Sequence, residues 1–162
     1  MRRNIGRATF SLLGIFMLVA CGSGTNTLDG SLADVVDLGY ERAELAAAEG
    51  SLVLKFLRPR GTGEDVVLKL SVNTAGLTAQ AVIDIDLTEQ VAELGPRGAV
   101  TRHVFEDPNE TLPPIRRGRL VLQEVAGTTD RVKGEFSATF TQGHEFGAGR
   151  TVYGEFEAEV IR

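Results

Sequence analysis

The C-terminal part of this 162-residue sequence contains the same alternation of apolar and polar residues twice. Apolar or small residues occupy every second position over residues 132–140 and again over residues 152–160. A period of two is typical of a strand with one buried face and one exposed face. The repeat therefore predicts two strands that need a larger sheet to cover one of their faces.

The two strands are expected to form an antiparallel hairpin around the glycine-rich segment 143–149. We predict the register that sets Phe136 opposite Phe156 and Gly134 opposite Ala158, because side chains of like size then face each other. A shift by one residue would turn every buried side chain outward. Errors of register are therefore expected in steps of two.

The same alternation predicts further strands earlier in the chain. They are expected at residues 66–72, 81–87, 100–105 and 119–125. Turn-forming groups rich in Gly, Pro, Asn and Asp separate them, and residues 107–109 are one such group. Short strands without a long helical period predict a single all-β domain, an antiparallel sandwich or barrel-like fold with a C-terminal hairpin.

Two earlier segments leave alternatives open. Residues 31–38 fit a short helix, which Gly39 would end almost at once. The alanine-rich run 40–48 favours a helix by intrinsic propensity. However, Glu49 and Gly50 stand directly before the alternating residues 51–58, and we favour a hairpin formed by 40–48 and 51–58.

The first twenty residues have the pattern of a secretory signal peptide. Arg2, Arg3 and Arg7 form a basic start, and a mostly apolar run follows at residues 8–20. At about 13 residues this run is too short for a hydrocarbon core that needs roughly 20. Residues 1–20 are therefore expected to be removed from the mature protein.

Leu18, Val19, Ala20 and Cys21 end this region. They resemble the lipobox of bacterial lipoproteins. The resemblance implies diacylglycerol on the sulfur of Cys21, cleavage before Cys21 and acylation of the new N-terminus. Several acyl chains anchor more firmly than one, because each buried CH₂ contributes about 0.8 kcal/mol. Cys21 is the expected lipidation site, and the alternative is an ordinary signal peptide followed by a chance cysteine.

Residues 21–30 are rich in small polar residues, and we expect a flexible tether between the lipid and a β-rich domain at 31–162. Gly22 stands where the enterobacterial pattern for retention at the inner membrane has Asp. In a cell with two membranes, this favours the outer one. Residues 134–140 and 149–158 also resemble the endings of small β-rich envelope lipoproteins without an assigned activity.

Charge and cysteine content exclude several classes of function. The net charge is −5, and it becomes −8 when the three N-terminal arginines are removed. Nucleic-acid binding needs a basic surface, so nucleic acid is not an expected partner. One cysteine allows no intramolecular disulfide and no cysteine-rich metal site. The remaining 142 residues are enough for a hydrophobic core.

The usual sequence motifs of catalysis are missing. There is no phosphate-binding glycine loop and no GxSxG nucleophile motif. The two histidines, His103 and His144, belong to no spaced metal motif. His144 and Glu145 would contribute to a metal or acid–base site only if His103 or the loop with Asp107 and Glu110 came close. We therefore expect no enzymatic activity, no cofactor and no metal.

An acidic group lies on the polar face of the terminal strands: Glu135, Glu155, Glu157 and Glu159. In the predicted register Glu135 is nearly opposite Glu157, and Lys133 is opposite Glu159. Like charges across a strand pair are mildly destabilising, which indicates either a bound cation or basic partner, or simply a solvated face.

A basic group follows two prolines: Arg116, Arg117 and Arg119. Guanidinium groups bind phosphate and carboxylate, so these side chains are candidates for an anionic headgroup or an acidic protein patch. The alternative is a surface cluster that offsets the acidic balance. Two alternate residues of segment 81–87, Asp84 and Asp86, are expected to point outward. They too could either bind a partner or simply be solvated.

Together these features predict a lipid-anchored protein of the bacterial cell envelope with a non-enzymatic role. It would bind another envelope protein or serve structurally. A closed barrel can hold one small molecule, so a carrier of an apolar ligand is the first alternative. A hydrolase with an unrecognised site is the second.

Overall fold

The computed structural model describes residues 28–78, 82–105, 107–125 and 127–161. The predicted signal peptide, Cys21 and most of the predicted tether lie outside these ranges. In chain order the elements are η1 (Ser31–Asp34), β1 (Arg42–Ala48), β2 (Ser51–Arg60), β3 (Gly63–Asn73), β4 (Val82–Asp86), η2 (Ala92–Leu94), β5 (Gly98–Val104), β6 (Asp107–Thr111), β7 (Ile115–Glu124), β8 (Arg131–Phe140) and β9 (Thr151–Ile161). The all-β prediction is confirmed. In the described part of the chain, no helix has the length and apolarity needed to cross a membrane.

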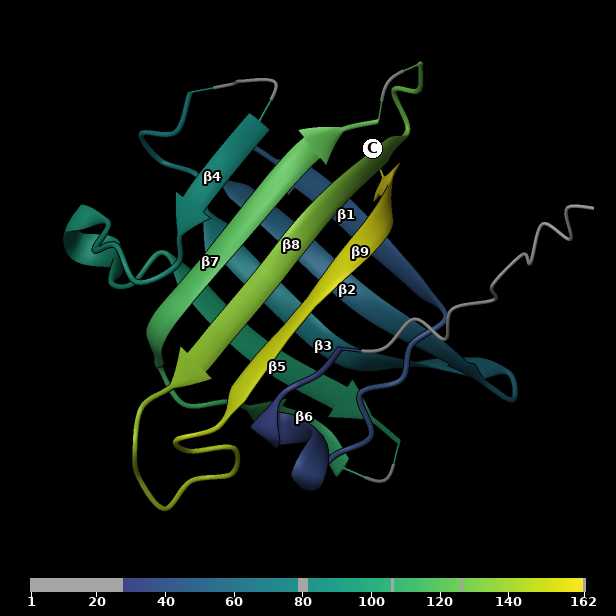
Figure 1. Cartoon of the computed structure of the whole chain (residues 1–162), viewed down its shortest axis with the longest axis vertical. Coiled ribbons are helices and arrows are strands. Elements are labelled where there is room, and N and C mark those ends of the chain that lie inside the picture. The colour runs from purple at the N-terminus through teal and green to yellow at the C-terminus, as the bar shows by residue number, and fades with distance from the viewer. Residues whose placement is uncertain (1–27, 79–81, 106, 126, 162) are drawn as a thin grey trace, which may run out of the picture.

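The nine strands form one sheet in the order β4-β7-β8-β9-β1-β2-β3-β5-β6. The sheet curls, so that β7, β8 and β9 cross over β1, β2, β3 and β5 (Figure 1). This arrangement confirms the barrel-like prediction. One detail differs from the predicted antiparallel fold, because β1 and β9 pair in parallel. The C-terminal hairpin lies in the middle of the sheet.

Leu87, directly after β4, links the two halves of the curled sheet. Its amide N–H donates to the carbonyl oxygen of Gly118 in β7 at 3.1 Å. Its own carbonyl oxygen accepts from the amide of Gly98 in β5 at 2.9 Å. The Leu87 side chain is fully buried. One residue thus connects β7 to β5 across the opening between the two sheet edges.

The N-terminal elements follow the sequence with two differences. β1 and β2 form the favoured hairpin, with Gly50 at a φ of 73° in the turn, where glycine is the least strained residue. The possible helix at 31–38 is only the short 3₁₀ helix η1. Leu28 is fully buried and Asp29 pairs with Tyr153, so the folded domain includes residues that we had assigned to the tether.

Residues 107–109 are not a turn. They begin β6, which pairs with β5 at an edge of the sheet. Pro108 interrupts the expected strand pattern because it has no amide hydrogen. An edge strand tolerates this loss, since one of its sides has no ladder to complete.

The predicted register of the C-terminal hairpin is wrong by two residues. Phe136 lies opposite Gly154, and Gly134 lies opposite Phe156. The same alternate residues remain buried, as expected for a shift in steps of two. The observed register has a steric reason: the ring of Phe156 occupies the space over Gly134, where a Cβ atom would lie 2.5 Å from Cζ of Phe156.

Aromatic side chains fill the centre of the core between the two layers. Phe56 of β2 is fully buried and contacts Phe136 of β8 and Phe156 of β9, with ring centroids 6.1 and 5.5 Å away. Tyr40 stands edge-on to Phe56 at 5.0 Å. The contacts of Phe56 connect β2 to β8 and β9, which lie in opposite layers of the curled sheet.

Candidate functional site

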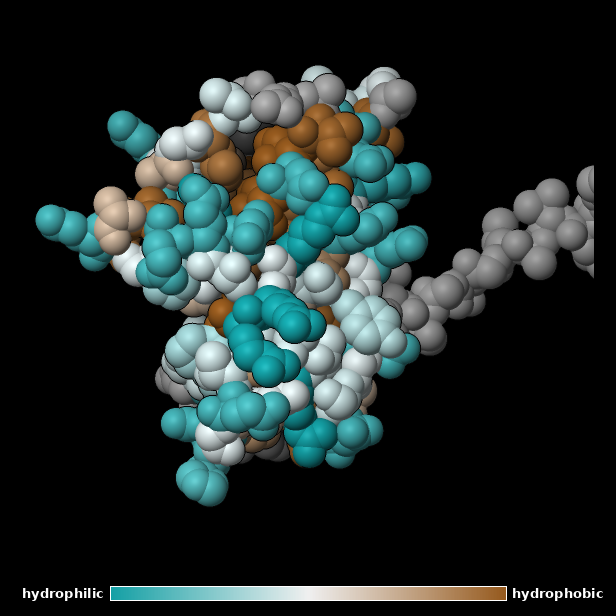
Figure 2. Space-filling view, turned by 60° about the vertical axis from the view of Figure 1, so that its left-hand side comes forward, coloured by the Kyte–Doolittle hydropathy of each residue, from teal (hydrophilic) through white to brown (hydrophobic). Residues whose placement is uncertain are grey.

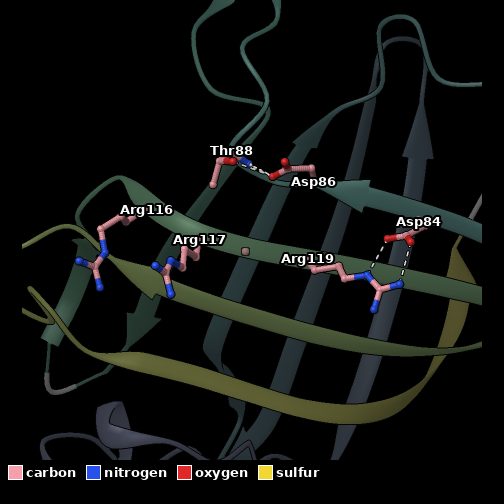
Figure 3. A pocket seen from close by; sticks show the side chains of 7 residues that line it. Asp84, Asp86, Thr88, Arg116, Arg117 and Arg119 are labelled. Atoms are coloured by element: carbon pink, nitrogen blue, oxygen red, sulfur yellow. Dashed lines mark hydrogen bonds and ion pairs between the residues drawn. The ribbon is translucent and has the colours of Figure 1, made fainter.

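A β-bulge in β7 places two arginines on the same face. Ile115 pairs with Phe140 and Arg117 with Thr139, so Arg116 is an extra residue in the ladder. Consecutive strand residues normally point to opposite faces, but a bulge disrupts this alternation. Arg116 and Arg117 are both exposed, and their side chains extend to the same side of β7 (Figure 3).

Arg119, two residues beyond Arg117, is neutralised by Asp84 of β4. Its Nε and Nη2 atoms donate to the two carboxylate oxygens of Asp84 at 2.8 and 2.7 Å. Hydrogen bonding to Arg119 lowers the pKa of Asp84, and Asp84 raises the pKa of Arg119. Both side chains are more than half exposed, so the pair adds little to stability.

Asp86 has its own local partner. One of its carboxylate oxygens accepts from the hydroxyl of Thr88 at 2.7 Å and from the amide of Thr88 at 2.8 Å. The hydroxyl bond, together with the amide bond, holds the pKa of Asp86 below its ordinary value. Asp86 is therefore ionised at neutral pH and held in a tight turn after β4.

These residues line a shallow groove of about 370 Å³ between β4 and β7. Asp84 and Asp86 are already hydrogen-bonded, whereas Arg116 and Arg117 form no hydrogen bond or ion pair with any residue that the structure describes. Hydrophilic side chains cover much of this side of the molecule (Figure 2). The groove can therefore offer two guanidinium groups to a phosphate or carboxylate.

The acidic group on the same outer surface is arranged differently from the prediction. Glu135 lies directly opposite Glu155, and Lys133 is opposite Glu157. Glu157 also forms an ion pair with Arg131 at 2.8 Å. Glu135 and Glu155 are exposed and line a second depression of about 200 Å³.

The two histidines do not gather into a site. His103 lies in β5 and His144 in the loop after β8, and both are exposed. In residues 28–78, 82–105, 107–125 and 127–161, no three His, Cys, Asp or Glu side chains are grouped so that they could hold a metal ion. Cys21, the predicted lipidation site, is not among the described residues.

Sequence reasoning missed three buried charged residues, Asp65, Arg97 and Arg102. Asp65 accepts from the amide of Phe105 at 3.1 Å and lies 3.5 Å from Arg58 and 3.6 Å from Arg60. Arg102 of β5 is only 8% exposed, and its buried Nε and Nη1 atoms have no hydrogen-bond partner. The alternation around Arg102 was a usable signal, because its neighbours at 100 and 104 are both buried valines.

Replacing Arg102 by methionine is expected to raise the free energy of unfolding by about 1–2 kcal/mol, because an apolar side chain removes a buried guanidinium group whose Nε and Nη1 atoms have no hydrogen-bond partner. Urea denaturation measures the change. Arg97→Met is the matched control, since Arg97 is equally buried but donates to Glu89, to the carbonyl of Asn73 and to that of Ala75. The control should lose about 2 kcal/mol or more. Equal losses in both variants would contradict the prediction.

Comparison of the chain with protein families, curated proteins and solved structures returned no significant match.

Proposed function

We propose that this chain is a bacterial lipoprotein that carries lipid on Cys21 and has a non-enzymatic binding or structural role in the cell envelope. The observation that carries the proposal is the unbroken order of a basic start, a short apolar run and the residues Leu18, Val19, Ala20 and Cys21. Each part alone is common. Their order matches the sequence that lipid attachment requires.

The folded domain supports a position close to the membrane. Leu28 is already buried in the domain and lies seven residues after Cys21. A fully extended chain spans at most about 3.6 Å per residue, so the domain lies within about 25 Å of the lipid. The proposal favours the outer membrane in a cell that has two, because Gly22 rather than Asp follows Cys21.

The surface supports binding rather than catalysis. The exposed groups without a partner in the groove between β4 and β7 are the guanidinium groups of Arg116 and Arg117, which bind anions but do not act as nucleophiles. The packing of the interior also favours a binding or structural role over a carrier of an apolar ligand. Phe56, Phe136 and Phe156 pack against one another at the centre, where a barrel carrier would hold its ligand.

Cys21→Ser tests the proposal. The variant is expected to lose incorporation of labelled palmitate and cleavage before residue 21, because Cys21 is the one cysteine of the chain and supplies the sulfur that accepts the diacylglycerol. The readouts are labelling, the mobility of the protein on a gel and its fractionation with membranes.

A second variant separates the lipobox from the mere presence of a thiol. Cys21→Ser combined with Ser23→Cys keeps one cysteine but moves it by two residues, from position 21 to position 23. This double variant should remain unlabelled. Normal processing and labelling of Cys21→Ser, or full labelling of the double variant, would refute the proposed lipid anchor.

A further inference from the structure

Two pairs of charged residues lie on the outer face of β7, β8 and β9. One pair is acidic, Glu135 and Glu155, and the other is basic, Arg116 and Arg117. We propose that this face binds the same face of a second copy of the chain. The inference goes beyond the proposed lipid anchor and does not depend on it. It identifies a partner for charged residues that form no direct hydrogen bond or ion pair with the described residues of one copy.

The acidic pair is only partly compensated within one copy, where Glu135 interacts electrostatically with Arg119 and Lys133 lines the same depression. Glu135 and Glu155 lie directly opposite each other on neighbouring strands, and like charges in that position destabilise a sheet. Neither forms an ion pair with a described residue. Lys133 is the single cation lining their depression, which therefore carries a net charge of −1.

The basic pair presents the same problem with the opposite sign. The bulge in β7 holds Arg116 and Arg117 side by side on the exposed face. Together with Arg119, Asp84 and Asp86, they give the groove a net charge of +1. Two depressions of opposite charge thus lie on one continuous sheet surface.

The strand register places these charges at opposite corners of a regular grid. Directly paired residues form three rows across the strands, each given in the order β7, β8, β9: Arg117, Thr139 and Thr151; Arg119, Ser137 and Tyr153; Val121, Glu135 and Glu155. Ser137 is at the centre, and Arg117 and Glu155 occupy opposite corners. A twofold axis lying between two such faces and passing over Ser137 exchanges those corners. Each Arg117 then meets Glu155 of the other copy.

The rest of the grid permits a close approach. Small side chains occupy its centre (Ser137), the position beside the centre on β8 (Thr139) and one corner (Thr151), and the two threonine hydroxyls are hydrogen-bonded to each other at 3.0 Å. Tyr153 is 47% exposed and adds apolar surface beside the centre. A twofold contact of one surface with itself is the commonest form of protein dimer. The complementary charges set its orientation.

Disulfide trapping tests the dimer at its axis. Ser137→Cys, in the full chain expressed in cells, should form a dimer under mild oxidation because the two Cys side chains meet at the axis. Thr62→Cys is the control, since Thr62 is exposed in the turn between β2 and β3, away from this face. Trapping at position 137 is expected to exceed that at 62 by about tenfold or more. Equal trapping would overturn the proposal.

The unmodified chain separates failure of this inference from failure of the lipid anchor. It contains Cys21 as its one cysteine. A disulfide dimer of that chain would reveal a free Cys21 thiol and refute lipidation. In that case, disulfide trapping at positions 137 and 62 would be compared in the Cys21→Ser background.

Charge reversal gives the sharper test. Arg116→Glu/Arg117→Glu makes both corners acidic, and Glu135→Arg/Glu155→Arg makes both corners basic. Added to Ser137→Cys, each reversal alone should reduce trapping about tenfold, because like charges then meet. Mixing the two differently tagged variants should restore trapping as a mixed dimer, which also shows that both are folded. Trapping that is unaffected by reversal, or no mixed dimer, would overturn the proposal.

Discussion

Replacing Phe56 by alanine is expected to lower the free energy of unfolding by about 3–5 kcal/mol, which is among the largest losses a single core substitution causes. Phe56 is fully buried and is the ring of β2 that contacts Phe136 and Phe156 in the opposite layer. Alanine would leave a cavity at this crossing and remove the edge-on contact with Tyr40. Chemical denaturation followed by circular dichroism measures the loss.

Phe105→Ala is the matched control for this substitution. Phe105 is 79% exposed and lies under the guanidinium group of Arg60, 5.2 Å from its ring centroid. Its removal should cost no more than about 1 kcal/mol, the value of an exposed cation–π contact. Similar losses for Phe56→Ala and Phe105→Ala would show that the core does not depend on the rings between the two layers.

Alternation along the sequence predicted which side chains of the strands are buried, but it could not predict every strand partner. Hairpins such as β1 and β2 are marked by a local turn at Gly50. The parallel pairing of β1 with β9, for example Ala43 with Ala158, joins opposite ends of the chain and has no such local mark. For this reason alternation alone did not show that β9 lies inside the sheet, between β8 and β1.

Bulges limited the prediction of the candidate site in the same way. The cluster of Arg116, Arg117 and Arg119 was visible in the sequence, but strict alternation would have put Arg116 and Arg117 on opposite faces. Their shared face depends on how β7 pairs with β8, which is a property of two strands together. The inward position of Arg102 followed the alternation and needed only the assumption that a charged residue can be buried.

Register is the other property that alternation leaves open, because a shift by two residues keeps every side chain on its face. The sequence contains Gly-Glu-Phe twice, at residues 134–136 and 154–156. In the observed register these tripeptides run antiparallel, so each phenylalanine faces a glycine. Matching large with large side chains, as we had predicted, ignores the space that a ring needs above its neighbour.

Gly134→Ala is expected to lower the free energy of unfolding by roughly 3 kcal/mol, the upper part of the range for overpacked cores. The new Cβ atom would lie 2.5 Å from Cζ of Phe156 and 2.6 Å from the carbonyl oxygen of Val121. A side chain can move away, but the backbone of β7 can do so only by distorting the sheet. Phe156→Leu replaces the ring by a smaller side chain, and it should therefore recover only part of the stability that Gly134→Ala loses.

The control for this substitution is Gly63→Ala at the start of β3, where the nearest atom to a new Cβ would be the carbonyl oxygen of Arg60 at 3.8 Å. Its stability should stay unchanged or rise slightly, because alanine restricts the unfolded chain more than glycine does. Phe156→Leu in the Gly134→Ala background decides between the two registers of the hairpin. With Ala158 opposite Gly134, the ring of Phe156 would not lie over Gly134, whereas the carbonyl oxygen of Val121 would still be close to the new Cβ atom. Partial recovery of stability by Phe156→Leu therefore identifies the register in which Phe156 covers Gly134 and Glu135 faces Glu155 on the outer surface, and no recovery would contradict it.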